Sequence, residues 1–193
     1  GGMAKLVATV PPPNGKAILV TTTDVTINGL EFSGAKVADR NGARINAFAN
    51  SQGRWRFAAD LDAVDPVFLK ELIEVEDKRF YSHPGVDPLA VLRAGRSAAS
   101  AGRVVSGAST ITMQTARLLE PRPRTFGSKL IEAARALQIE RRLSKDEILT
   151  LYLTLAPYGG NIEGVRAASL HYFDKEPSAL SASERALLIA LPQ

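Results

Sequence analysis

Residues 65–85 of this 193-residue chain read DPVFLKELIEVEDKRFYSHPG. The pair Asp65-Pro66 is a typical opening of a helix, because proline is tolerated at the first helical position. Apolar residues then recur at the spacing of a helix, at Phe68, Leu69, Leu72, Ile73 and Val75. The stretch therefore predicts a helix from residue 66 to about residue 79, and it marks a change from β-type to helical sequence.

Further helices are expected after this one. Asp87-Pro88 opens the next, and the pairs Ser144 with Glu147 and Ser181 with Glu184 have the spacing of capping boxes. Apolar periodicity fixes the rest. The expected helices cover about 87–101, 110–119, 128–143, 144–155, 164–173 and 181–193.

The chain before residue 61 has β-type rather than helical sequence patterns. Short β-prone runs at 17–20 and 25–27 alternate with Asn-Gly turn signals. We therefore expect a small β-rich segment over residues 1–60 and a mainly α domain over 61–193. Residues 25–35 look like one rung of a parallel β-helix, but a single rung cannot bury its own face. The sequence does not identify the origin of residues 1–36.

Composition excludes several kinds of site. The chain is 45% hydrophobic and 23% charged, as is usual for a globular fold. It has no cysteine, which excludes disulfides, thiolate zinc sites and cysteine nucleophiles. Its two histidines, His83 and His171, are far apart and predict no metal cluster. No stretch has the roughly 20 apolar residues that span a bilayer, and no signal peptide is visible.

Positive charge gathers between Arg117 and Lys145. Eight cations face three anions there, within a chain of net charge +4. Such an excess favours an anionic partner such as phosphate, pyrophosphate, nucleic acid or a lipid headgroup. A solvated helix surface is the simpler interpretation of a charge run.

Two glutamates stand out as candidate catalytic carboxylates. Glu76 has apolar and aromatic neighbours, including Phe80, which suits a general base. Glu132 lies three residues from both Lys129 and Arg135, and residues at that spacing are neighbours on a helix. A solvated glutamate and a surface ion pair are the ordinary alternatives.

The segment between the two glutamates is rich in hydroxyls. Ser109 and Thr110 stand before an apolar run that also contains Gln114. They could form a simple helix N-cap, or a cradle for phosphate at a helix N-terminus.

The segments around Glu76, around Ser109 and around Glu132 each follow a sequence pattern of a known family. Residues 76–85 match Glu-Asp-x-x-Phe-x-x-His-x-Gly, and residues 107–114 match Gly-x-Ser-Thr-Ile-Thr-x-Gln. Residues 128–132 match Arg-Lys-x-x-Glu, except that Ser128 replaces the arginine.

Two further segments complete the set. Residues 145–154 match Lys-x-x-Ile-Leu-x-x-Tyr-Leu-Asn, with Thr154 in place of the asparagine. Residues 164–175 are similar to a fifth pattern, with Asp174 where glycine is frequent. In this order the five segments resemble the peptidoglycan glycosyltransferase domain, glycosyltransferase family 51. They look most like the 1C subtype of class A penicillin-binding proteins.

The resemblance implies a lysozyme-like helical glycosyltransferase domain that polymerises lipid II by inverting transfer, with release of undecaprenyl pyrophosphate. Glu76 is then the general base, and Glu132 orders nearby cations or holds a divalent ion such as Mg²⁺. The residues implied in substrate binding are Asp77, Phe80, His83, Ser109, Thr110, Gln114, Arg117, Arg124 and Lys129. His83, ahead of Pro84-Gly85, is also well placed to fix a turn.

The same resemblance implies partners and location. The implied partners are lipid II, the growing glycan strand and other cell-wall synthesis proteins, and nucleic acid is not among them. The implied location is the outer face of a bacterial cell membrane. The family's membrane anchor is not visible in this chain. Residues 86–105 mix apolar residues with Arg93, Arg96 and Arg103, and they are the candidate for membrane contact or else an ordinary flexible loop.

Two other functions stay open from sequence. A lysozyme-like enzyme that cleaves glycan also works through a glutamate on a helical lobe. A non-catalytic module that binds anionic lipid or glycan needs only the positive charge. The cations around Glu132 argue against the first, because a hydrolase has no pyrophosphate to bind.

Overall fold

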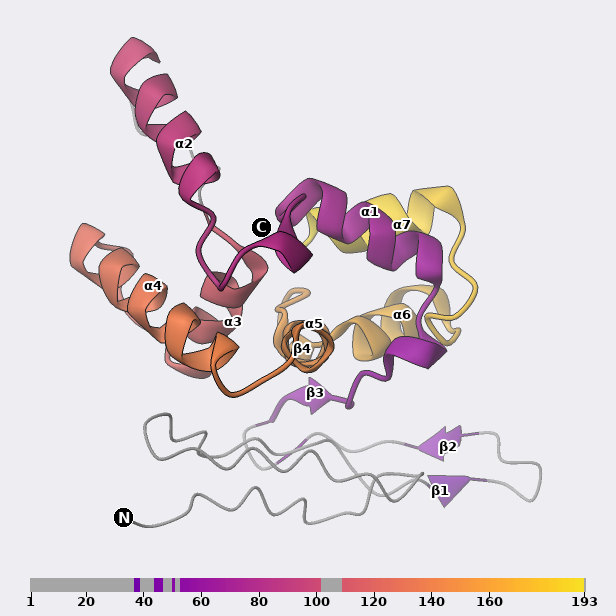
Figure 1. Cartoon of the computed structure of the whole chain (residues 1–193). Helices are drawn as coiled ribbons and strands as arrows, with labels where there is room; N and C mark the ends of the chain where they lie inside the picture. Colours follow the sequence, from indigo (N-terminus) through magenta and orange to yellow (C-terminus); the bar gives the residue numbers. More distant parts are fainter. Residues whose placement is uncertain (1–36, 39–43, 47–49, 51–52, 102–108, 193) are drawn as a thin grey trace. The chain divides into compact units, whose positions relative to one another are not determined.

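The computed structural model describes residues 37–38, 44–46, 50, 53–101 and 109–192 (Figure 1). Its helices are α1 (Pro66–Glu76), α2 (Pro88–Ala101), α3 (Ile111–Leu119), α4 (Phe126–Glu140), α5 (Lys145–Leu155), α6 (Val165–Phe173) and α7 (Ala182–Ala190). Short 3₁₀ turns are η1 (Leu61–Ala63) and η2 (Phe80–Ser82). The strands are β1 (Val37–Ala38), β2 (Arg44–Asn46), β3 (Trp55–Arg56) and β4 (Ile162–Glu163). The expected mainly α fold is confirmed.

Some helices begin or end at other residues than predicted, because side chains form hydrogen bonds at their ends. The first helix stops at Glu76, because the next residue, Asp77, turns its side chain toward another part of the chain. The fourth begins at Phe126, since the Thr125 hydroxyl caps it by accepting from the Ser128 amide at 3.1 Å. It ends at Glu140, where 143 was expected.

Both predicted capping boxes are present. Ser181 and Glu184 cap α7 reciprocally, with the Ser181 amide donating to the Glu184 carboxylate at 2.6 Å. The Ser144 amide donates to Glu147 at 2.7 Å before α5. These bonds satisfy amides that the helix itself leaves without partners.

The described chain divides into two compact units. One comprises the described residues up to Asp65 together with those from Leu153 onward, and the other comprises those of Pro66–Tyr152. In the first unit β3 pairs in parallel with β4, and α6 packs against both strands and against α7. The predicted β runs at 17–20 and 25–27 lie outside the described residues.

Buried polar contacts tie the first unit together. Arg56 is buried, and its Nε donates to Glu163 at 2.7 Å between the two paired strands. The Thr154 hydroxyl, also buried, accepts from the Ala59 amide at 3.0 Å. The threonine that replaces the family's asparagine therefore joins a helix end to the strand region.

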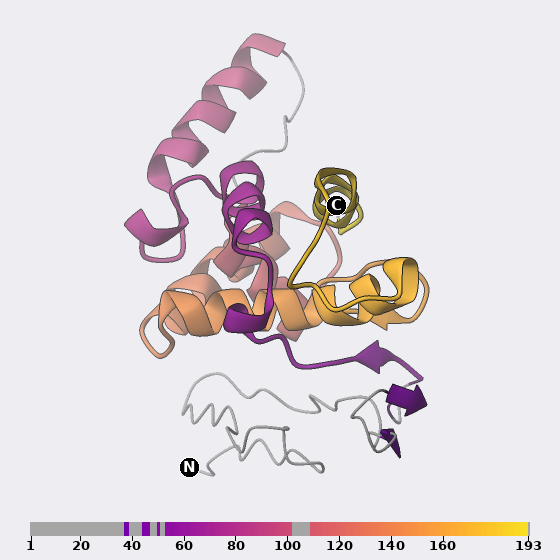
Figure 2. The ribbon, with the colours of Figure 1, turned by 90° about the vertical axis from the view of Figure 1, so that its right-hand side faces the viewer.

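The second unit is built on the packing of α3 against α4 (Figure 2). The buried residues of α4 recur at helical spacing, and two of them are polar: Ser128, Glu132, Ala136 and Ile139. Helix α2 extends away from this pair in both views. The α3–α4 pairing thus carries a carboxylate into a protected position.

Asp87 fixes the start of α2 and offers a test of the fold. Its Oδ1 accepts from the amides of Leu89 (2.9 Å) and Ala90 (3.1 Å), and its Oδ2 accepts from Arg79 Nε at 3.1 Å. Chiefly the Arg79 hydrogen bond, aided by the two amides, lowers the pKa of Asp87 from 3.8 to about 2. Asp87 therefore acts as an ionised helix cap.

We expect Asp87→Ala to lower the free energy of unfolding at pH 7 by about 1–2 kcal/mol, the usual cost of losing a helix cap. Because the folded pKa lies below the unfolded one, this contribution is complete above about pH 4 and is lost as pH falls toward 2. Urea unfolding at pH 7 and pH 2.5 measures both effects. The difference between the variant and wild type should shrink at pH 2.5. Replacing the exposed Asp62 is the control, and an equal difference at both pH values would contradict the assignment.

Candidate active site

Glu76 ends α1 and is held by a side chain of α3. Gln114 Nε2 donates to Glu76 Oε2 at 2.8 Å. Glu76 is partly exposed. A carboxylate that is oriented by an amide and reachable from solvent has the properties of a general base.

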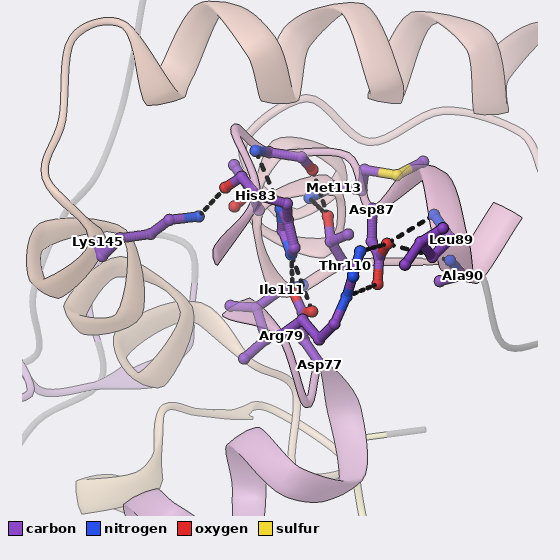
Figure 3. Close-up of polar contacts among 12 residues, drawn as sticks. Asp77, Arg79, His83, Asp87, Leu89, Ala90, Thr110, Ile111, Met113 and Lys145 are labelled. Atoms are coloured by element: carbon purple, nitrogen blue, oxygen red, sulfur yellow. Dashed lines mark hydrogen bonds and ion pairs between the residues drawn. The ribbon is translucent and has the colours of Figure 1, made fainter. Parts of the chain in front are cut away.

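The residue after Glu76 anchors that helix end to the start of α3 (Figure 3). Asp77 is buried, and its Oδ2 accepts from the Ile111 amide at 3.0 Å. His83 Nε2 lies 2.9 Å from Asp77 Oδ1, and His83 Nδ1 accepts from the Gly85 amide at 3.2 Å. Because Nδ1 is an acceptor, the neutral ring carries its proton on Nε2 and donates it to Asp77.

The turn at Gly85 packs closely against its neighbours. Thr110 caps α3 by accepting from the Met113 amide at 3.1 Å, and its hydroxyl donates to the Gly85 carbonyl at 2.5 Å. Gly85 has φ +94°, and a Cβ there would lie 2.8 Å from the Ala136 carbonyl oxygen. Any side chain would be excluded on both grounds, which explains the glycine.

A second group of polar residues surrounds Lys129 on α4. Its Nζ donates to the Ser109 hydroxyl. Burial lowers the pKa of Lys129, and the nearby cations Arg117 and Arg124 lower it further, while Glu132 opposes them. Three cations and one carboxylate therefore share one neighbourhood.

Glu132 is the most constrained member of this group. It is only 7% exposed, and its Oε2 atom is buried with no hydrogen-bond partner among the residues that the structure describes. Leaving a buried acceptor unsatisfied costs about 1–3 kcal/mol, and more for a charged group. Such an atom among cations is best explained by a role in the site rather than by stability.

The two carboxylates belong to the same region of the second unit. Tyr152 is buried, and its pKa is raised first by that burial and then by Glu76, while Arg117 lowers it. Arg117 also lowers the pKa of Lys129, whereas the charge of Glu132 raises it. Tyr152 and Arg117 thus connect the surroundings of Glu76 with those of Glu132.

The residues predicted from sequence fall into two sets. The first set keeps side chains among the charged groups or at Glu76: Ser109, Gln114, Arg117, Arg124, Lys129 and Glu132. The second set is buried, and its side chains contact other parts of the protein: Asp77, Phe80, His83 and Thr110. For the second set the geometry favours a positioning role over the expected direct contact with substrate.

Two polar residues were not singled out from sequence: Tyr152 within this region, and Glu140 at the end of α4 beside it. Tyr152 belongs to the fourth matched pattern, so its position in that pattern was the available signal. Glu140 lies eight residues after Glu132, where two and a quarter helical turns bring a side chain back near the same face. That spacing gives its place on the helix but not its partner Thr112, which is distant in the sequence.

A metal site finds limited support. Within the described ranges, no three His, Asp or Glu side chains are grouped so that they could hold a metal ion. Glu132 Oε2 offers a single carboxylate oxygen beside Lys129. The donor set fits a divalent cation that would share its other ligands with a bound substrate. It does not fit a resident metal held by the protein alone.

The described helices include none that is long and apolar enough to cross a bilayer. Exposed apolar side chains nevertheless occur along α2, at Leu89, Val91 and Leu92, and at Phe126, which begins α4.

Comparisons with known proteins give one consistent result. Residues 41–193 match the family described as Transglycosylase. The chain is 50% identical over 157 residues to penicillin-binding protein 1C of Escherichia coli (strain K12), covering 81% of this chain and 20% of that protein. It is 43% identical over 140 residues to penicillin-binding protein 1A of the same organism, covering 72% of this chain and 16% of that protein.

A relative from Bacillus subtilis (strain 168), penicillin-binding protein 1F, is 36% identical over 160 residues, covering 82% of this chain and 22% of that protein. The chain therefore spans about a fifth of the length of the curated relatives that it matches.

Proposed function

This chain belongs to the Transglycosylase family, and from that membership we propose that it polymerises lipid II into peptidoglycan glycan strands. The single observation that carries the proposal is the pairing of two groups in one unit. Gln114 of α3 orients Glu76, and α3 packs against α4, which carries Lys129 and Glu132. One group can accept a proton while the other receives negative charge.

The acceptor sugar would be activated at Glu76. Its carboxylate takes the proton from the acceptor's 4-hydroxyl as that oxygen attacks C1 of the donor sugar. The bond between C1 and the pyrophosphate oxygen breaks on the opposite face, so the configuration at C1 inverts. A positioned base of this kind contributes about 10²–10⁴-fold to the rate.

The leaving pyrophosphate would be received by Lys129, Arg117 and Arg124. Preorganised cations placed where charge develops usually lower the barrier of such a reaction more than any other group does. Arginine suits the task because its planar fork binds phosphate through two parallel hydrogen bonds. Glu132 would hold Lys129 in place and provide one oxygen to a divalent cation such as Mg²⁺ carried by the pyrophosphate.

The test is incubation of the chain with purified lipid II and gel analysis of the products. We expect a ladder of glycan strands that grows with time. Added preformed glycan separates the alternatives, because a cleaving enzyme would shorten it. A non-catalytic module would bind lipid II and yield neither ladder nor fragments, and either outcome would refute the proposal.

The substrate is a lipid, and we propose that α2 meets the membrane surface at the outer face of a bacterial cell. Leu89 and Leu92 are 52% and 61% exposed, and Arg93 and Arg96 on the same helix are exposed cations. An amphipathic helix with basic residues binds anionic lipid surfaces. Residues 102–105 of the predicted contact stretch lie outside the described residues.

We expect the double change Leu89→Ser with Leu92→Ser to weaken binding to vesicles containing phosphatidylglycerol about tenfold or more, because each buried leucine contributes roughly 1.5–3 kcal/mol. Sedimentation with the vesicles measures it. Val67→Ser with Val75→Ser is the matched control, since these α1 residues are 46% and 60% exposed. Equal loss in both double variants would contradict a specific role for α2.

A further inference from the structure

Glu140, the last residue of α4, is an acidic residue with little exposed side chain, and it lies outside the two groups described above. Its side chain is 9% exposed. Its Oε1 accepts from the Thr112 hydroxyl at 2.6 Å and from Lys145 Nζ at 2.6 Å. Thr112 is on α3 and Lys145 begins α5, so one carboxylate oxygen joins three helices.

The same cluster reaches the turn that follows Glu76. Lys145 Nζ also donates to the His83 carbonyl at 2.7 Å (Figure 3), and it lies 4.5 Å from the centre of the Phe80 ring. A Cβ on Gly85 would lie 2.9 Å from Glu140 Cγ, so the turn and the glutamate are in close contact. The segment 77–85 is therefore held against the end of α4.

These contacts fix two helices that carry different halves of the site. Helix α3 carries Gln114, which orients Glu76, and α4 carries Lys129 and Glu132. A rotation or slide of α3 against α4 would break the bond between Thr112 and Glu140. Because a misplacement of about 1 Å can cost about 10²-fold in rate, this restraint bears on catalysis.

We propose that Glu140 is a positioning residue of the transfer reaction. Through Thr112 and Lys145 it holds α3 in place relative to α4. It thereby positions Gln114, which orients the base, relative to the α4 cations that receive the leaving group. It contacts no substrate. This inference rests on the proposed function, and it predicts that loss of Glu140 lowers kcat more than it changes KM.

Steady-state kinetics of the whole chain with lipid II test it. We expect Glu140→Ala to lower kcat about 10–30-fold with KM changed by less than about threefold. Glu140→Gln should keep kcat within about threefold of wild type, because its amide oxygen still accepts from both donors. Glu74→Gln is the control, since Glu74 pairs with Lys78 on the exposed face of α1. A change in KM alone, or full kcat in Glu140→Ala, overturns the proposal.

A double-mutant cycle separates positioning from general damage. In a Gln114→Ala background, Glu140→Ala should cost clearly less in kcat than in wild type, because the two residues act on the same base. Fully additive losses overturn the proposal.

If the wild-type chain makes no polymer, the proposed function is refuted. Hydrogen exchange still tests the positioning role of Glu140 in that case. Glu140→Ala should speed exchange of the Ile111 and Met113 amides at the start of α3 about tenfold. Both amides donate to side chains of the network, to Asp77 and Thr110. Unchanged exchange at both amides overturns the positioning role.

Discussion

Glu76→Gln is expected to lower the rate of lipid II polymerisation by about 10²–10⁴-fold, the usual contribution of a positioned general base. A glutamine at this position cannot accept the proton of the attacking hydroxyl. Its amide oxygen can still accept the hydrogen bond that Gln114 Nε2 now donates at 2.8 Å. The change therefore removes the proton transfer while it preserves the local geometry.

Two measurements on this variant give the result its meaning. Gel analysis of glycan strands reports the rate, and binding of labelled lipid II should stay within about threefold of wild type, because the cations remain. Glu74→Gln, one half-turn earlier on α1, should polymerise normally. A Glu76→Gln variant that still forms strands at the wild-type rate would remove Glu76 from the mechanism.

Much of the fold could be predicted from the sequence, because its helices carry local signals. Apolar periodicity and capping residues need only neighbours a few positions away. The capping box at Ser181 and Glu184 is such a signal, and the structure has it. The family patterns placed Glu76 and Gln114 in one site, but the hydrogen bond between them was not predicted.

The features that could not be predicted from the sequence depend on contacts between residues far apart in the chain. The first helix ends at Glu76 because Asp77 accepts a hydrogen bond from Ile111, 34 positions away. Periodicity alone has no information on that bond. The same applies to Glu140, whose partner Thr112 lies 28 positions earlier.

Exposure was the other property that the sequence could not supply. Asp77 and His83 bear groups that can bind a sugar or a phosphate, yet both are buried and bonded to each other. Residue type suggests a ligand contact, whereas burial assigns these side chains to the scaffold that holds Glu76. Similarly Ser128, which replaces the family's arginine, joins its hydroxyl to Thr125 at 2.9 Å at the start of α4.

Lys129→Met should reduce polymerisation about 10²–10³-fold, the typical loss when one preorganised group facing developing charge is removed. Methionine keeps most of the side-chain length, and it lacks the positive charge and the donor to Ser109. Lys78→Met is the matched control, because Lys78 is exposed and paired with Glu74. An equal loss in both variants would indicate a general effect of charge.

The pH profile tests the same residue independently. Burial lowers the pKa of Lys129, so its charge should be lost below the ordinary lysine value of about 10.4, and polymerisation should fall with it. The unfolded lysine holds its proton more tightly than the folded one, so this group makes the fold more stable as pH rises through that interval. Titration of Lys129 therefore does not unfold the protein, and the fall in polymerisation reports the lost charge. Lys129→Arg, which stays charged, should move the alkaline limb to higher pH. An alkaline limb unchanged in Lys129→Arg would mean that another group receives the pyrophosphate charge.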